Sequence, residues 1–148
     1  MKRNAILVSL SILISFLISS CGGTSAPSGP TQTPDPCSPT EVQKYIDAID
    51  DVERRFDDAY TLANSTARGS LSPVIGELQA IRRDAEDLDV PSCAEKARDN
   101  LVIYMDAVIE GFLLFLSNES DEKVGSQFIT ANTYFKNYLN SLANLSGD

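Results

Sequence analysis

The sequence predicts an all-α protein, more specifically an antiparallel up-down-up-down four-helix bundle that follows a disordered N-terminal tether. Four stretches repeat apolar residues three and four positions apart, helix start signals precede them, and short polar segments separate them. No stretch alternates apolar and polar residues as a half-buried strand does. Four helices of about 16 to 27 residues with short connections favour an antiparallel bundle, because short links place consecutive helices side by side.

The first helix is expected to begin in the segment Ser-Pro-Thr-Glu at 38–41. This segment offers a Ser N-cap, a Pro at the first helical position and a Glu three residues after the Ser, which together form a capping box. The apolar positions that follow at helical spacing are Val42, Tyr45, Ile46, Ile49, Val52, Phe56, Tyr60 and Ala63. The polar segment 64–69 then interrupts the pattern, so the helix is expected to end there.

The second helix is expected to start at Ser72-Pro73 and to end at the Asp-Val-Pro segment 89–91. Ser92 and Glu95 form another predicted capping box, which opens the third helix. Residues 101–116 of this helix are apolar nearly all round, except for Asp106 and Glu110. The third helix is therefore predicted to be the most buried of the four.

The fourth helix is expected to follow the polar turn 118–121, whose acidic residues suit a helix N-terminus. Its apolar positions at helical spacing are Val124, Phe128, Ala131, Phe135, Tyr138, Leu142 and Leu145. The four helices define a domain at residues 37–148, which is long enough to bury a core of its own.

The first 20 residues have the organisation of a signal peptide. Lys2 and Arg3 form a basic start, and residues 5–18 form an apolar run relieved only by three serines. This run of about 14 residues is too short for a comfortable membrane span of roughly 20 residues. The segment Leu-Ile-Ser-Ser-Cys at 17–21 resembles the lipobox of bacterial lipoproteins.

The resemblance to bacterial lipoproteins implies that residues 1–20 are a lipoprotein signal peptide and that Cys21 carries the lipid, with acyl chains such as palmitate. Several acyl chains make membrane attachment effectively stable, whereas one chain binds only marginally. The implied location is the extracytoplasmic side of the cell membrane or outer membrane. Gly22 follows the Cys where an inner-membrane retention signal has Asp, which favours the outer membrane or surface in a cell with two membranes. The helical domain resembles those of small, uncharacterised lipoproteins, which implies a location and no activity.

Residues 21–36 are assigned to the acylated Cys and a flexible tether. Residues 22–36 contain four of the seven prolines and no Leu, Ile, Val or aromatic residue. Such a segment cannot bury enough apolar surface to offset the entropy of ordering it. At about 3.1 Å per residue when extended, it could hold the domain up to roughly 45 Å from the lipid.

Cys37 and Cys93 remain after lipidation of Cys21, and an even pair in an oxidising compartment favours a disulfide. Cys37 precedes the first helix and Cys93 begins the third, and these two ends lie together in an up-down bundle. Closing a loop of about 57 residues contributes on the order of 4 kcal/mol in the chain-entropy model. Two reduced thiols and a metal pair are the alternatives.

The composition excludes several classes of function. The chain has no His, so Ser-His-Asp relays and His-containing zinc motifs are absent. The formal net charge of −9, without any cluster of Lys and Arg, argues against nucleic acid as a partner. Removal of the signal peptide also removes Lys2 and Arg3, which makes the mature charge −11. We expect no enzyme activity, no metal and no cofactor.

Three groups of acidic residues are candidate sites, and the group at the end of the second helix is interpreted as a solvated face; it consists of Asp84, Glu86, Asp87 and Asp89. Asp47, Asp50, Asp51, Asp57 and Asp58 are interpreted as a solvated face on which Asp50 pairs with Arg54 and Asp51 with Arg55. Asp106 and Glu110 lie four residues apart on one face of the third helix, as its exposed edge or as the lining of a polar pocket.

The aromatic residues of the first, third and fourth helices are either core or the lining of an apolar cavity. The candidate pocket residues are Tyr104, Asp106, Glu110, Phe128 and Tyr138. The leading hypothesis for function is a lipid-anchored, non-enzymatic module that binds an envelope protein or has a structural role in the envelope. The alternative is a carrier or sensor that holds a small apolar ligand between the helices.

Overall fold

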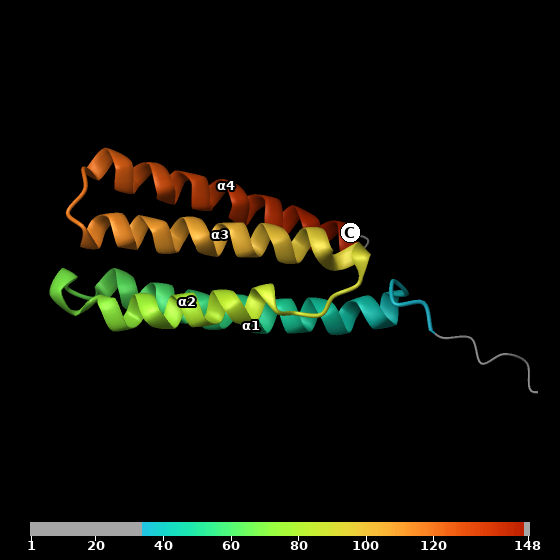
Figure 1. Cartoon of the computed structure of the whole chain (residues 1–148). Coiled ribbons are helices and arrows are strands. Elements are labelled where there is room, and N and C mark those ends of the chain that lie inside the picture. Colours follow the sequence, from blue (N-terminus) through green and yellow to red (C-terminus); the bar gives the residue numbers. More distant parts are fainter. Residues whose placement is uncertain (1–33, 147–148) are drawn as a thin grey trace, which may run out of the picture. The chain divides into compact units, whose positions relative to one another are not determined.

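The computed structural model describes residues 34–146, and this part of the chain is all-helical, without any strand (Figure 1). The helices are α1 (Pro39–Ser65), the short 3₁₀ helix η1 (Arg68–Ser70), α2 (Ser72–Glu86), α3 (Ser92–Leu116) and α4 (Asp121–Ser146). The predicted all-α class is confirmed. The signal peptide, Cys21 and nearly all of the tether lie outside the described residues.

The helix starts lie within a residue of their predicted positions, but the two predicted capping boxes are wrong. Ser38 is the N-cap of α1, yet its side chain makes no capping hydrogen bond, and its backbone carbonyl instead accepts from the N–H of Val42 at 2.9 Å. Ser92 is the first residue of α3 because the preceding Pro91 takes the extended N-cap conformation. The Glu95 N–H then donates to the Pro91 carbonyl at 3.2 Å.

α3 is the central helix of the domain and is buried along most of its length, as its apolar sequence predicts. Its buried residues are Ala94, Ala97, Leu101, Tyr104, Met105, Ala107, Val108, Ile109, Gly111 and Phe112. Side chains from α1, α2 and α4 join these residues in one hydrophobic core. Consequently α1, α2 and α4 all pack against α3.

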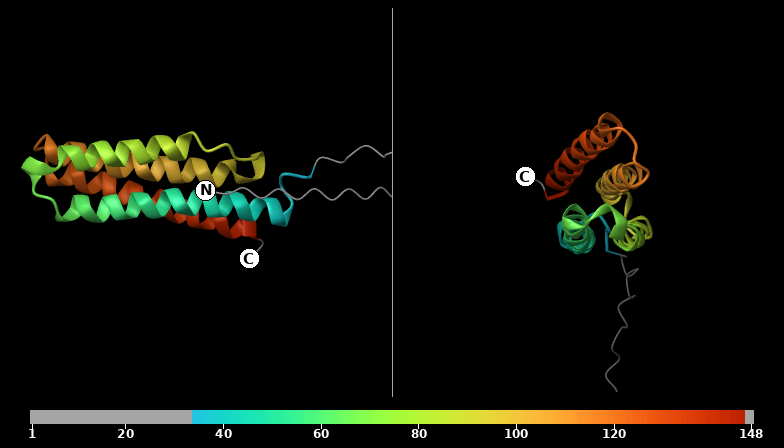
Figure 2. Two further views of the ribbon diagram at one scale, coloured as in Figure 1. Left: turned by 90° about the horizontal axis from the view of Figure 1, so that it is seen from below. Right: turned by 90° about the vertical axis from the view of Figure 1, so that its left-hand side faces the viewer.

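The helices lie side by side in two pairs, α1 with α2 and α3 with α4 (Figure 2). α4 packs closely on α3 along much of its length but meets α1 at few points. Only Ala131, Tyr138 and Ser141 of α4 are buried. Among residues 34–146, no helix is both long enough and apolar enough to cross a membrane.

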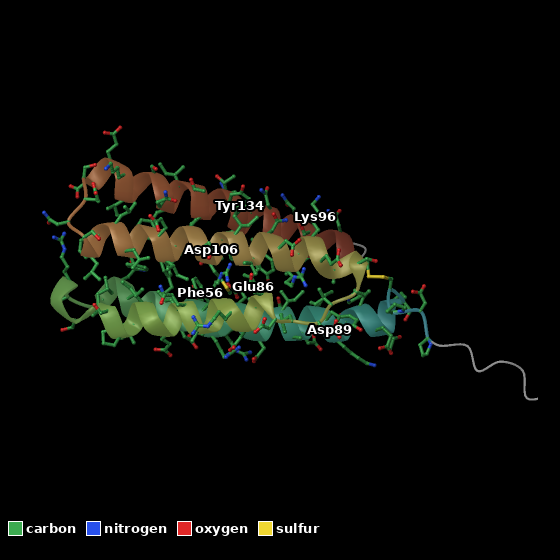
Figure 3. The ribbon with its side chains drawn as sticks, in the orientation of Figure 1. Phe56, Glu86, Asp89, Lys96, Asp106 and Tyr134 are labelled. Atoms are coloured by element: carbon green, nitrogen blue, oxygen red, sulfur yellow. A yellow bond between two sulfur atoms is a disulfide. The ribbon has the colours of Figure 1, made fainter. Side chains whose placement is uncertain are left out.

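A disulfide joins Cys37, just before α1, to Cys93 in the first turn of α3 (Figure 3). The two Cα atoms are 6.1 Å apart, which is within the usual range for a disulfide. This agrees with the predicted pairing and ties the start of α1 to the start of α3.

Asn118 forms the turn between α3 and α4, with a positive φ of 60° that Asn tolerates better than most residues. Its N–H donates to the Phe115 carbonyl at 3.1 Å, and the Glu119 N–H donates to the Leu114 carbonyl at 3.0 Å. These bonds form a Schellman motif, which ends α3. The Ser120 hydroxyl then accepts from the Lys123 N–H at 3.4 Å and caps α4.

Candidate functional site

A solvent-open cavity of about 330 Å³ lies between α1 and α4, with α3 as its floor. We call it the aromatic groove. Its lining residues are Asp57, Tyr60, Tyr104, Val108, Phe128, Ala131, Asn132 and Phe135. The groove exists because α4 is held by α3 and contacts α1 at few points, so aromatic side chains rather than backbone fill the space between them.

The aromatic walls of the groove are held in place by edge-on and tilted ring contacts. The Tyr104 ring lies 5.6 Å from Phe56 and 5.0 Å from Phe135, measured between ring centroids. The Phe128 ring lies 5.4 Å from Phe112. These distances are typical of favourable aromatic pairs, so the walls are preorganised by the core behind them.

Phe128 separates the groove from a second cavity of about 190 Å³. The second cavity is lined by Ala63, Asn64, Thr66, Phe112, Phe115, Val124 and Phe128. Gly111 on α3 lets the Phe128 ring come close, because a Cβ at Gly111 would lie 3.0 Å from the tip of that ring. A Cβ at position 111 would therefore require the Phe128 ring to shift by a few tenths of an ångström.

The α1 edge of the groove is acidic. Asp57 lines the groove, and Glu53 lies one helical turn before it. Partial burial of Glu53, together with repulsion from Asp57 and Asp50, raises the pKa of its carboxyl group above the ordinary value of 4.5. Burial, followed by the nearby charge of Glu53, also raises the pKa of the Tyr104 hydroxyl. The groove is therefore apolar on its floor and negatively charged along one rim.

Two of the five predicted pocket residues line the aromatic groove, and the other three do not. Tyr104 and Phe128 line the aromatic groove together. Tyr138 is buried, and its hydroxyl donates to an Asp50 carboxylate oxygen at 2.9 Å, which links α4 to α1. Neither Asp106 nor Glu110 lines the aromatic groove.

Asp106 is exposed on the edge of α3, which is one of the two positions that the sequence suggests for it. Its carboxylate accepts from the Arg82 guanidinium at 2.8 and 3.1 Å and so joins α3 to α2. Glu110 is also exposed. Asp106 also lines a polar hollow of about 420 Å³, the other interpretation of the sequence, whereas Glu110 does not. The remaining lining residues are Arg82, Glu86, Arg98, Asp99, Val102 and Ile103, and the charged ones pair with one another or with Asp106.

The predicted ion pairs on α1 are half right. Asp51 lies 3.7 Å from Arg55, as predicted. Asp50 instead accepts the hydrogen bond from Tyr138, and Arg54 pairs with Asp51. A tertiary contact from α4 thus replaces the local pair that helix spacing favours.

Asp57, Val108, Ala131 and Asn132 line the groove but are not among the site residues that the sequence predicts. Asp57 was grouped with the solvated acidic face, yet it lies three residues before Tyr60 and so shares a helix face with it. That spacing could have indicated that Asp57 lies beside the aromatic residues. Nothing in the sequence marked Asn132, because its importance comes from the separation of α4 and α1.

The described residues do not form a metal centre. Among residues 34–146, no three Cys, Asp or Glu side chains are arranged so that they could hold a metal ion. Comparison of the chain with protein-family models, with curated proteins and with solved structures gives no match. The groove's own chemistry is therefore the basis for assigning a function.

Proposed function

We propose that this chain is a lipid-anchored, extracytoplasmic, non-enzymatic binding protein whose aromatic groove holds a small ligand with an apolar body. The observation that carries the proposal is the open cavity of about 330 Å³ lined by Tyr60, Tyr104, Phe128 and Phe135. Ligand sites are typically concave, mostly apolar and about 300–1,000 Å³ in volume, with a few polar groups that orient the ligand. Asp57 and Asn132 would supply such polar groups here.

The proposed lipid anchor rests on the N-terminal sequence. A basic start, a short apolar run and a Cys after two small residues together favour lipidation of Cys21. The Pro-rich segment 22–36 would give the domain reach above the membrane surface, toward a ligand or a partner.

We also infer an antiparallel up-down-up-down bundle for the four helices. The links between successive helices lie at alternate ends in Figure 1, which supports this arrangement. The disulfide favours it too, since it joins the starts of α1 and α3, which an up-down order puts at one end.

Docking of an envelope protein is the second candidate function. Two large apolar side chains of α4 support it, because Ile129 is 71% exposed and Leu139 is 47% exposed. Apolar side chains left exposed on one helix are available for contact with a partner protein. The two functions are compatible, because these residues do not line the groove.

Native mass spectrometry of the full chain, released from its own membrane in a gentle detergent, tests ligand binding. We expect a bound small molecule, and we expect Asn132→Trp to lose it because Asn132 is exposed and lines the groove. Asn140→Trp is the matched control, since Asn140 is also exposed on α4 but does not line the groove. Equal ligand content in the two variants would overturn the proposal.

A further inference from the structure

We propose that the ligand of the aromatic groove is a small organic cation, an ammonium group that carries apolar substituents. This inference rests on the proposed function and specifies the ligand class of the same site. It is carried by one juxtaposition: the carboxylate of Asp57 and the rings of Tyr60, Tyr104 and Phe135 line the same cavity.

The aromatic lining favours a cation because ring faces carry partial negative charge. An ammonium or quaternary ammonium group within about 6 Å of a ring centroid is attracted to it, and several rings around one site form an aromatic cage. Tyr104 and Phe135 are in contact at 5.0 Å, and Tyr60 lines the same cavity from α1. A cation between α1 and α4 would therefore meet rings from three helices.

The negative charge along the α1 edge of the groove also favours a cationic ligand. No Lys or Arg side chain lines the groove. Elsewhere on α1 carboxylates do have cationic partners, as in the pairs of Asp51 with Arg54 and Arg55. Among the described residues neither Asp57 nor Glu53 forms an ion pair, although they lie four residues apart and repel each other. A bound cation would relieve this repulsion.

Other ligand classes fit less well. An anionic ligand would be repelled by the acidic rim and by the net charge of −9, whereas a cation would be attracted to both. A bare metal ion would need several oxygen ligands, and the described residues hold no cluster of three acidic side chains that could bind one. A neutral apolar ligand would leave the carboxylate of Asp57 without a partner.

Choline and its neutral carbon isostere 3,3-dimethylbutan-1-ol test the charge of the ligand, because they have the same shape. Both are titrated by ligand-observed NMR into the full chain held in micelles of dodecyl maltoside, a detergent without an ammonium group, with empty micelles as the blank. We expect saturable binding of choline and binding of the isostere that is at least about tenfold weaker. Asp57→Asn should weaken choline binding by about tenfold, and added salt should weaken it as well.

Asp58→Asn is the matched control, because it removes the same charge one residue away and Asp58 does not line the groove. It should change choline binding by less than about twofold. Equal binding of choline and the isostere, with both lost in Asn132→Trp, would overturn the cationic ligand while leaving the proposed function intact. Binding of neither molecule would also overturn the cationic ligand, whereas the proposed function is overturned only by equal ligand content of Asn132→Trp and Asn140→Trp in native mass spectrometry.

Discussion

Gly111 lets the ring of Phe128 lie against α3, and through Phe128 it shapes the groove. A Cβ at Gly76 or at Gly125 would meet nothing within 4 Å, whereas a Cβ at Gly111 would meet the Phe128 ring at 3.0–3.2 Å. A glycine in a helix interior costs roughly 0.5–1 kcal/mol relative to alanine. Of these three helical glycines, only Gly111 lies where a Cβ would contact another side chain.

Gly76→Ala should raise the free energy of unfolding by about 0.5–1 kcal/mol, because it gains helix propensity without a clash. The free energy of unfolding of Gly111→Ala should be about 1–2 kcal/mol lower than that of Gly76→Ala, because the new Cβ displaces the Phe128 ring. Urea unfolding followed by circular dichroism measures both. Equal stabilisation by the two substitutions would show that Phe128 does not depend on the space at Gly111.

Glu53 makes the stability of the domain depend on pH in a defined direction. Its pKa is raised in the folded state, so the folded state binds this proton more tightly than the unfolded state does. Ionised Glu53 therefore lowers stability at neutral pH, and this cost disappears as the pH falls through its folded pKa. A cation in the groove would reduce the same cost.

Glu53→Gln should raise the free energy of unfolding by about 0.5 kcal/mol at pH 7, because it removes a partly buried charge and its repulsion from Asp57 and Asp50. The gain should vanish below about pH 4, where Glu53 is protonated in both states. Urea unfolding at several pH values checks it, with Glu110→Gln on the exposed edge of α3 as the control. A gain that persists at low pH would contradict the electrostatic origin.

At the level of helices, the apolar periodicity predicted the number and positions of the four α-helices, which local sequence controls. Apolar spacing and the Ser-Pro segments at 38–39 and 72–73 placed α1 and α2, and the positions of Cys37 and Cys93 predicted the disulfide. The side-chain cap of α3 was not predicted correctly because Pro91 takes the N-cap position in place of Ser92. At α1 the N-cap is Ser38, as predicted, but its hydroxyl makes no capping bond. One residue of shift is enough to change which group caps a helix.

The groove was less predictable, because it depends on how far α4 stands from α1. Tyr104 and Asp106 were placed in one pocket, although two residues along a helix turn the side chain by about 200°. Helical phase alone would therefore have separated them. The link from Tyr138 to Asp50 could not be read from sequence, since 88 residues separate the partners.

Removal of the disulfide tests how α1 is held against α3. The double substitution Cys37→Ser and Cys93→Ser should lower the free energy of unfolding by about 2–4 kcal/mol, because it frees a long loop in the unfolded chain. The same loss should follow from reduction of the unsubstituted protein. A loss below about 1 kcal/mol in both experiments would mean that packing alone aligns the two helices.

For the whole molecule, the proposed anchor would act together with the acidic domain. Lipidation of Cys21 would hold a chain whose mature charge is −11 close to a membrane surface, with the tether setting its distance. A negatively charged domain concentrates cations around itself at low salt. The proposed anchor and the negative charge would therefore favour capture of a cationic molecule near the membrane.

Cys21→Ser should block labelling of the chain with radioactive palmitate in cells that process lipoproteins. It should also move the chain out of the detergent-soluble membrane fraction that holds the unsubstituted protein, because stable attachment needs more than one acyl chain. Cys37→Ser serves as the control, since Cys37 is disulfide-bonded and should not affect labelling. Unchanged labelling of Cys21→Ser would contradict the anchor.

The most direct test of ligand binding is a crystal structure of the full chain purified from its own membrane. We predict continuous non-protein density between Tyr60, Tyr104 and Phe135, with its charged end within about 4 Å of the Asp57 carboxylate. A groove closed by inward movement of α4, with Phe128 and Phe135 packed against Tyr60, would contradict it.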